Sequence, residues 1–147
     1  MNHQKYIRHC IELAKIALEN GDPPVGAVII HKNEIIGQGI EAGKSTGDIT
    51  NHAEILAIRN AISNGKKALL AEAILYSTHE ACAMCSYLIR HHKIPVLVFG
   101  TSVKDLGGYS SEFKILKTKN IAKWQHTPEV IIGILEEECL ALSNNFR

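Results

Sequence analysis

The segment from residue 73 to residue 100 constrains the fold of this chain most strongly. It holds two short apolar stretches, AILYST at 73–78 and PVLVFG at 95–100, on either side of CAMCSYLIRHH, whose apolar spacing is that of a helix. A strand, a helix and a strand joined by so short a crossover require the two strands to run parallel. Helices cover the faces of sheets that contain parallel strands, so this order predicts an α/β sandwich.

Further helices and strands are predicted on both sides of this unit. Their boundaries follow from apolar periodicity, from glycine and asparagine at helix ends, and from turn residues between apolar stretches. Before the unit, the prediction comprises a helix from about Ile7 to Asn20-Gly21, a hairpin over 25–40 that turns at 31–33, a loop over 39–51 and a helix from His52 to Asn64-Gly65. After the unit comes a weakly patterned region over 101–128, with a loop at 107–111 and a short turn or helix at 113–116. A strand at 129–134 and a closing helix at 135–146 end the prediction.

Length and composition bound the organisation of the chain. With 147 residues, of which 46% are hydrophobic, it has enough apolar surface for one compact core. It shows neither an internal repeat nor a linker, so we expect a single domain over residues 1–147. The 16 basic and 15 acidic residues are spread along the chain without a run of one sign, which does not indicate a strong attraction to nucleic acid.

The apolar stretches and the cysteines indicate where the protein works. No stretch approaches the roughly 20 apolar residues that cross a bilayer, and the first ten residues are too polar for a secretion signal, so we expect a cytoplasmic protein without membrane contact. Cys82 and Cys85 form a C-x-x-C pair, which in a cytosolic chain favours metal binding or redox chemistry. Cys10 and Cys139 lie in apolar helical patterns and are expected in the core.

Two predicted helix starts carry the chemistry. His52-Ala53-Glu54 begins one helix, the C-x-x-C pair begins the next, and the N-termini of neighbouring βα units lie at the same edge of a sheet. One imidazole and two thiolates suit Zn²⁺, and three protein ligands leave the fourth tetrahedral position open for water. We therefore predict one catalytic zinc ion per chain on His52, Cys82 and Cys85. Glu54, a carboxylate two positions after His52 in sequence, is placed to carry a proton from the water to a leaving amine.

Each half of this pattern also has a plainer interpretation. A C-x-x-C pair alone is as often redox-active or structural as catalytic, and a single H-x-E occurs by chance. A structural zinc site needs a fourth protein ligand, for which His79, Cys10 and Cys139 are weak candidates. His91 and His92, at the end of a predicted helix, are expected in solvent, where they interact favourably with the helix dipole.

Together these residues resemble the H-x-E…C-x-x-C signature of the cytidine deaminase superfamily, in the branch of cytosine, guanine and tRNA adenosine deaminases. The resemblance runs from PPVGAVI through GDITNHAEILAIR and CAMCSYLI to GILEEECLAL. It implies a three-layer α/β/α sandwich around a five-stranded mixed sheet and a homodimer whose partner subunit helps to complete the pocket. It also implies zinc on His52, Cys82 and Cys85, proton transfer by Glu54, and contact between the backbone of Ala53 and the bound ring.

Two positions depart from the family pattern. Ala81 stands where the family usually has proline before the first cysteine, a change expected to affect loop stiffness more than chemistry. Glu41 falls where related deaminases place an asparagine that hydrogen-bonds the substrate ring. Because an ionised glutamate can only accept hydrogen bonds, we hypothesise that the substrate presents N–H donors to Glu41. The alternative is that Glu41 faces solvent in a polar loop.

Three functions fit these observations. The leading one is a zinc-dependent hydrolase that releases ammonia from an exocyclic amine of a free nucleobase or related small heterocycle, of the cytosine, isocytosine, guanine or aminotriazine type. Trp124, with Phe113 or Tyr109, is a candidate wall for the ring. Editing of adenosine in tRNA is less favoured, because the charge is near neutral, no basic tail follows Phe146 and Glu41 replaces asparagine. A non-catalytic zinc-stabilised binding module is disfavoured by the presence of Glu54.

Overall fold

The computed structural model describes residues 2–146, which fold around a five-stranded sheet. The strands are β1 (Gly26–His31), β2 (Glu34–Ile40), β3 (Ile74–His79), β4 (Val96–Thr101) and β5 (Glu129–Ile132). They lie in the order β2-β1-β3-β4-β5; β1 is antiparallel to both neighbours, whereas β3, β4 and β5 are parallel. The predicted α/β fold with a mixed sheet is therefore confirmed. Met1 and Arg147, the ends of the predicted domain, lie outside the described residues.

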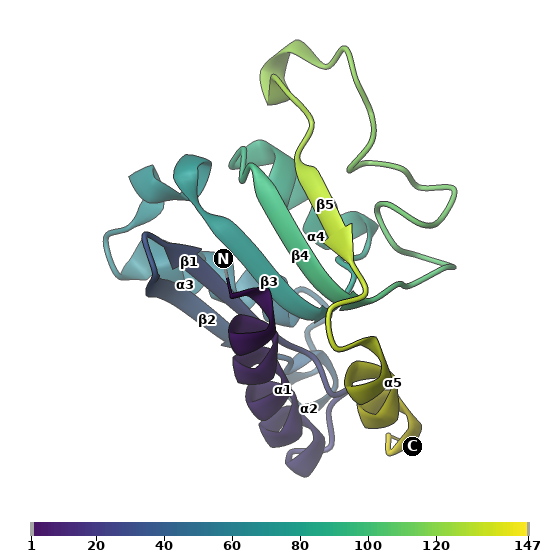
Figure 1. The fold of residues 1–147 in the computed structure, drawn as a ribbon. Helices are drawn as coiled ribbons and strands as arrows, with labels where there is room; N and C mark the ends of the chain where they lie inside the picture. Colours follow the sequence, from purple (N-terminus) through teal and green to yellow (C-terminus); the bar gives the residue numbers. More distant parts are fainter. Residues whose placement is uncertain (1, 147) are drawn as a thin grey trace.

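Helices cover both faces of the sheet (Figure 1). The α-helices are α1 (His3–Glu19), α2 (Gly43–Thr46), α3 (Ala53–Ser63), α4 (Ala83–His91) and α5 (Glu136–Asn144), and two 3₁₀ helices are η1 (Lys67–Glu72) and η2 (Ala122–Trp124). α1 and α5 pack on one face, and α3 and α4 on the other. The fold thus has the three layers that the resemblance implies.

The core divides into two halves because successive residues of a strand point to opposite faces. Val28, Tyr76 and Val98, from three adjacent strands, are buried in the half that includes α1 and α5. Their neighbours Leu75 and Leu97 are buried in the half that includes α3 and α4. Each central strand is therefore apolar on both sides, which explains why the sequence shows continuous apolar runs rather than alternation.

The predicted hairpin forms with a two-residue turn. Lys32 and Asn33 have φ angles of 49° and 66°, so both adopt the left-handed conformation. Two such residues form the type I′ turn, whose twist matches that of the strands it joins. The turn sets the register in which Ile30 pairs with Ile35 and His31 with Glu34.

A glycine in β2 allows α3 to start directly over the sheet. A Cβ atom on Gly39 would lie 2.1 Å from the carbonyl oxygen of Ala53 and 2.6 Å from the backbone nitrogen of Ala57. Any larger residue at this position would push the first turn of α3 away from β2. The close contact holds the N-terminus of α3 at the edge of the sheet where β3 also ends.

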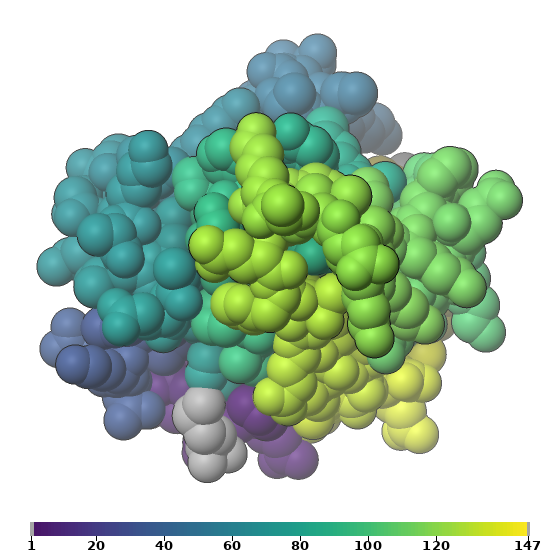
Figure 2. Space-filling model, turned by 90° about the horizontal axis from the view of Figure 1, so that it is seen from above, coloured from purple at the N-terminus to yellow at the C-terminus, as the bar shows by residue number. Residues whose placement is uncertain are grey.

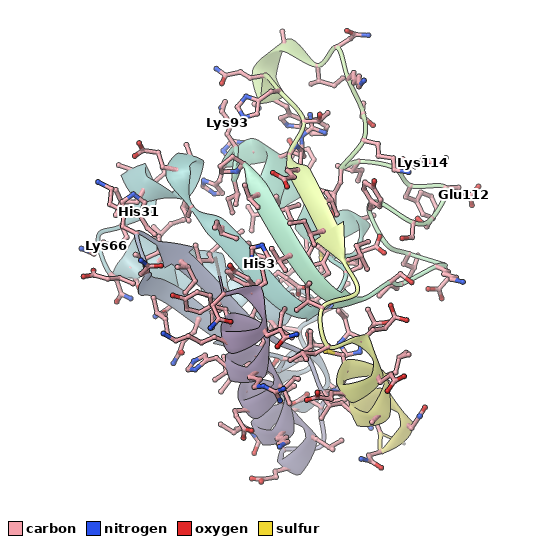
Figure 3. The ribbon with its side chains drawn as sticks, viewed as in Figure 1. His3, His31, Lys66, Lys93, Glu112 and Lys114 are labelled. Atoms are coloured by element: carbon pink, nitrogen blue, oxygen red, sulfur yellow. The ribbon has the colours of Figure 1, made fainter. Side chains whose placement is uncertain are left out.

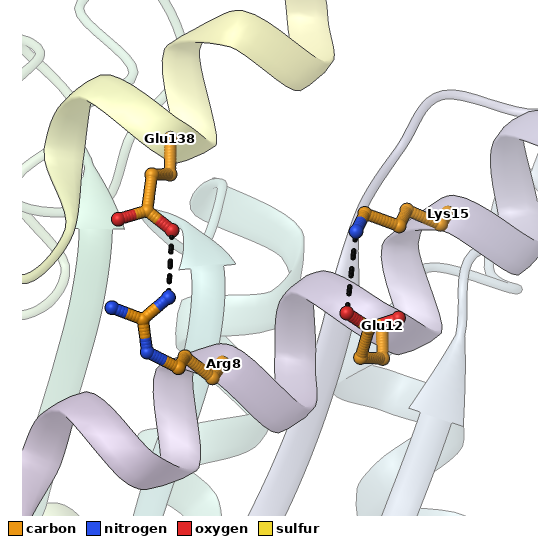
Figure 4. A network of polar contacts seen from close by, with 4 residues as sticks. All are labelled: Arg8, Glu12, Lys15 and Glu138. Atoms are coloured by element: carbon orange, nitrogen blue, oxygen red, sulfur yellow. Dashed lines mark hydrogen bonds and ion pairs between the residues drawn. The ribbon is translucent and has the colours of Figure 1, made fainter.

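Helix α5 packs beside α1 mainly through buried apolar side chains. Cys139 and Leu142 of α5 are buried in the same core half as α1. A surface ion pair adds to this contact, since Arg8 Nη1 lies 3.0 Å from Glu138 Oε2 (Figure 4). Both side chains are about half exposed, so the pair contributes little beside the apolar burial.

Several boundaries differ from the prediction. The predicted loop over 39–51 begins with the end of β2 and contains the short helix α2. η1 was not predicted, and the weakly patterned region contains η2. The last strand ends at Ile132 because Gly133 (φ 108°) and Leu135 (φ 55°) turn the chain toward α5. Among the described residues, none of the helices has the length and apolar character needed to cross a membrane.

Candidate metal centre and active site

Three predicted ligands meet at the starts of α3 and α4. His52 is the residue that precedes α3, Cys82 precedes α4, and Cys85 lies in the first turn of α4. The Nδ1 atom of His52 lies 3.5 Å from the sulfur of Cys82 and 3.4 Å from that of Cys85. The two sulfur atoms are 3.7 Å apart. The three donor atoms therefore form a compact triangle.

This triangle has the size of one face of a tetrahedral zinc site. Zinc–sulfur bonds of about 2.3 Å and zinc–nitrogen bonds of about 2.0–2.1 Å at tetrahedral angles place two sulfurs about 3.8 Å apart and a sulfur and a nitrogen about 3.6 Å apart. The observed separations of 3.7, 3.5 and 3.4 Å agree with these values. The prediction of one zinc ion is thus confirmed, because His52, Cys82 and Cys85 are positioned to bind it.

Within residues 2–146, no fourth protein ligand joins these three. His79, the weak candidate, is bonded at both ring nitrogens. Its Nδ1 lies 2.9 Å from the hydroxyl of Thr78, and its Nε2 lies 2.7 Å from the hydroxyl of Ser143. A tetrahedral ion on the three ligands would keep one position for a non-protein ligand, which is typical of catalytic zinc sites.

Hydrogen bonds among the three ligands shift their pKa values when no metal is bound. A hydrogen bond from Cys85 lowers the pKa of the Cys82 thiol to about 4. The bond to Cys82 raises the pKa of His52 to about 9, and the bond to Cys82 together with burial raises that of Cys85. The metal-free set therefore holds one thiolate, and a zinc ion that enters displaces protons from the other two ligands.

Glu54 lies beside the ligands in the first turn of α3. Only 4% of this residue is exposed. Its Oε2 accepts a hydrogen bond from the hydroxyl of Ser77 at 3.2 Å, and its Oε1 lies 3.9 Å from the sulfur of Cys85. Burial raises the pKa of Glu54 to about 7. A carboxyl group with such a pKa exchanges protons readily near neutral pH.

A cavity of about 260 Å³ opens beside the metal ligands. It is formed by the predicted residues Glu41, His52, Glu54 and Cys82 and by side chains of other segments that the prediction did not include. These additional residues are Pro23, Val25, His79, Glu80, Val103 and Leu106.

Glu41 is buried at the cavity rather than exposed in a polar loop. Only 5% of the residue is accessible to solvent. Its Oε1 accepts the backbone N–H of Ala53 at 3.1 Å, and its Oε2 accepts that of Gly43 at 3.2 Å. Burial raises the pKa of this carboxyl group. The solvent-facing alternative is wrong. The backbone of Ala53, which the resemblance assigns to the ring, already donates its N–H to Glu41.

The candidate aromatic wall does not line this cavity. Trp124 packs elsewhere: the Arg90 guanidinium lies 4.8 Å from its ring centroid, and the Tyr87 ring meets it edge-on at 5.6 Å. Phe113 is 46% exposed, and Tyr109 lies under the ammonium group of Lys117. A contact between a bound ring and Trp124 of the same chain has no support in this arrangement, because Arg90 and Tyr87 occupy two sides of the indole.

Glu80 is a site residue that the sequence reasoning missed. Its buried carboxylate accepts three backbone N–H groups, from Val103 at 3.0 Å and from Tyr109 and Ser110 at 2.8 Å. These bonds hold the segment after β4 against the cavity, where Val103 and Leu106 form part of the wall. A carboxylate two positions before a metal-ligating cysteine, at the end of a buried strand, was the signal that could have identified it.

Comparison with known proteins gives a consistent result. Residues 1–101 match the family model of the cytidine and deoxycytidylate deaminase zinc-binding region. The tRNA-specific adenosine deaminase of Haemophilus influenzae is 40% identical over 92% of this chain and 78% of its own length. That of Buchnera aphidicola subsp. Baizongia pistaciae is 42% identical over 97% of this chain and 86% of its own. A solved structure from studies of A-to-I editing by tRNA:A34 deaminases has a TM-score of 0.85 at 28% identity and covers 94% of this chain and 98% of that chain.

These relatives correct two predictions. The preference for a free nucleobase as substrate is contradicted, because relatives at 40% and 42% identity over most of the chain are tRNA-specific adenosine deaminases. For the same reason the expectation of a small-molecule partner, with nucleic acid not favoured, is wrong. Both predictions relied on the near-neutral net charge and on the replacement of asparagine by Glu41. Neither observation shows how charged side chains are distributed over the surface of the folded protein.

Proposed function

Because the chain belongs to the cytidine and deoxycytidylate deaminase family, we propose that it deaminates adenosine in tRNA, which yields inosine and ammonia. The observation that carries the proposal is the three-ligand metal centre, which has no fourth protein ligand in the described chain and lies beside the buried carboxyl group of Glu54. A zinc ion on these ligands supplies a Lewis acid that makes water reactive near neutral pH. A module that only binds RNA would have no use for this carboxyl group, so the site is that of an enzyme.

In this mechanism Glu54 transfers the protons. Hydrolysis adds water at C6 of the adenine ring and breaks the bond from C6 to the exocyclic nitrogen, so a proton must move from the water to the departing amine. The Ser77 hydroxyl orients the Glu54 carboxyl group by donating to Oε2. With a pKa raised to about 7 by burial, Glu54 accepts a proton in one step and returns it in a later one.

Glu41 is proposed to contact the nucleotide. Each carboxylate oxygen has more than one lone pair, so both can keep their backbone partners and still accept an N–H or O–H group of the substrate. The backbone of Ala53 contributes through the same bond, because it fixes the position of the Glu41 carboxylate. Replacement of Glu41 by asparagine restores both a donor and an acceptor, so comparison of the two proteins on adenosine, cytidine and guanosine in RNA tests this contact.

The location and the oligomeric state remain predictions. A tRNA substrate fits the cytoplasmic location expected from the sequence. Light scattering on the purified, zinc-loaded protein checks the homodimer that the resemblance implies. The chain has a mass of 16.2 kDa, and a measured mass of about twice this value supports the homodimer. A mass near 16 kDa would leave the monomer as the active form.

A substrate panel tests the proposed function. Zinc-loaded protein is incubated with unmodified tRNA and anticodon stem-loops, and in parallel with adenine, adenosine, cytosine, isocytosine, guanine and an aminotriazine. Inosine is measured in digested RNA by mass spectrometry, and ammonia is measured in the small-molecule reactions. We expect inosine in RNA and little ammonia from the free compounds. Rapid ammonia release from a free base, with no inosine in any RNA, would overturn the proposal.

A further inference from the structure

One exposed segment of this chain carries four positive charges and no negative charge. Four lysines and no acidic residue lie between residues 113 and 128; the whole chain has 16 Lys and Arg against 15 Asp and Glu, which leaves 12 against 15 elsewhere. We call residues 114–123 the lysine segment. Its lysines are all exposed, namely Lys114, Lys117, Lys119 and Lys123. The near-neutral total therefore hides a positive segment on a chain that is otherwise slightly acidic.

Buried residues hold the lysine segment in a fixed course. Arg90 of α4 is 2% exposed, and its Nη1 donates to the carbonyl oxygens of Ile115 and Thr118. Leu116 is buried in the core half that contains α3 and α4. Trp124 covers the Arg90 guanidinium at 4.8 Å. Because Nη2 has no hydrogen-bond partner among the described residues, the guanidinium depends on these two carbonyl oxygens, and displacement of the segment would leave the buried charge unpaired.

Backbone hydrogen bonds connect the lysine segment to the residue before the first cysteine ligand. The carbonyl oxygen of Ala81, the residue before Cys82, accepts the N–H of Gly108 at 2.8 Å. The carbonyl oxygen of Gly108 in turn accepts the N–H of Leu116 at 2.9 Å. Two successive backbone hydrogen bonds thus connect Ala81 to Leu116 in the lysine segment. From there the chain runs along the outside of the molecule to the far end of β5 (Figure 1).

The charges of the segment are available to a partner. Among the described residues, none of its lysines forms an ion pair with an acidic side chain. The Lys117 ammonium lies 4.2 Å from the centroid of the Tyr109 ring, and Lys114 projects from the side of the molecule opposite Lys66 (Figure 3). Seen from above, the green atoms of the segment spread over the outer surface (Figure 2). The exposed ring of Phe113 adjoins them and offers a face on which an unpaired base can stack.

We propose that the lysine segment binds the phosphate backbone of the RNA whose adenosine enters the cavity. This inference rests on the proposed function and names the surface through which the substrate docks. Exposed lysines without acidic partners recognise phosphates, which supply most of the sequence-independent affinity for RNA. Because the segment is tied through Gly108 to Ala81, RNA phosphates bound along it would hold the RNA on the side of the molecule from which the adenosine enters the cavity.

A charge-removal experiment tests the proposal. Lys114, Lys119 and Lys123 are replaced together by glutamine; Lys117 is kept because its ammonium packs on Tyr109. The matched control replaces three exposed lysines elsewhere, Lys15, Lys66 and Lys67, and so removes the same charge. A third protein carries arginine at 114, 119 and 123, which keeps the charge. Circular dichroism and zinc content establish that all proteins fold and hold metal.

Binding of a fluorescent tRNA anticodon stem-loop is measured by anisotropy between 50 and 300 mM salt. Each phosphate contact contributes about 0.7–0.9 to the slope of log affinity against log salt, so the triple glutamine variant should lower its magnitude by about 2. Its affinity at 100 mM salt should fall by about tenfold or more, and KM for tRNA should rise equally with little change in kcat. The Lys15, Lys66, Lys67 control and the arginine variant should stay within about threefold of wild type.

The outcomes separate this inference from the proposed function. Equal affinities and salt slopes in the two triple glutamine variants would overturn the lysine segment as the docking surface even if the enzyme edits tRNA. If the wild-type protein makes no inosine in any RNA, the proposed function fails. A loss of RNA binding restricted to the 114, 119, 123 variant would still support the docking surface in that case.

Discussion

Glu54 places a buried carboxyl group between the metal ligands and the Ser77 hydroxyl. The spacing of His52 and Glu54 on one helix start, and of Cys82 and Cys85 on the next, could be predicted from sequence because each pair depends on one turn of backbone. The positions of Glu41 and Trp124 could not. Glu41 folds back onto Ala53, and Trp124 packs on Arg90, through contacts that depend on the tertiary arrangement.

Replacement of Glu54 by glutamine tests its role in proton transfer. The amide keeps the size of the side chain but cannot accept and return a proton. We expect kcat for inosine formation to fall by about 10²–10⁴-fold while zinc stays near one ion per chain. Single-turnover assays and elemental analysis of the same preparation measure both quantities. A zinc-loaded variant with activity within tenfold of wild type would assign the proton transfer to another group.

At the scale of elements, the end of β3 lies at the cavity and contacts α5 through His79. His79 contacts Thr78 and, through Nε2, the Ser143 hydroxyl in α5. Three residues later the chain reaches Cys82, one of the metal ligands. The order of strands and helices could be predicted because apolar runs and turn residues mark each element, whereas α2, η1 and η2 are too short to show a period. The contact from β3 to α5 spans 64 residues and leaves no local signal.

His79 gives this part of the fold a pH dependence. Burial lowers the pKa of its imidazole to about 4, below the usual value of 6.5. The unfolded chain therefore takes up a proton between pH 6.5 and 4 that the folded chain does not. The contribution of the neutral His79 to the free energy of unfolding is therefore fully present above pH 6.5. It is lost as the pH falls from 6.5 to about 4.

Urea unfolding at pH 7.5 and at pH 5 measures this effect. The free energy of unfolding of wild type should fall by about 1–2 kcal/mol more than that of a His79→Gln variant, which has no group to titrate there. Acid weakens zinc binding in both proteins, so the difference between them isolates the histidine. Parallel losses in the two proteins would show that His79 is not held neutral by burial.

At the scale of the whole molecule, the metal joins two helices that pack on the same face of the sheet. Its ligands come from the starts of α3 and α4, and both helices share one core half. The net charge averages the lysine segment with an acidic remainder, so it does not reveal the surface on which we propose that RNA docks. Fold class could be predicted from the parallel β3–β4 pair, but the surface distribution of charge requires the course of residues 101–128.

Removal of zinc should lower the stability of the entire chain, which we propose is one domain. Zinc binds the folded state in preference to the unfolded one, so its loss reduces the free energy of unfolding. We expect one cooperative thermal transition, shifted to lower temperature by a chelator. A Cys82→Ser variant should melt at the lower temperature with or without chelator, whereas Cys139→Ala should respond to the chelator as wild type does. Two separate transitions, or a melting temperature that chelator leaves unchanged in wild type, would contradict this account.

The most direct test of the central claim is the origin of the oxygen in the product. Zinc-loaded protein is incubated with tRNA in ¹⁸O-labelled water, and the digested nucleosides are analysed by mass spectrometry. Hydrolysis at the zinc site predicts inosine that carries one ¹⁸O atom and an equal amount of ammonia. With the Glu54→Gln protein, both products should form at least about 10²-fold more slowly. The account would be contradicted if tRNA incubated with fully zinc-loaded protein contained no inosine, or if its inosine carried no ¹⁸O.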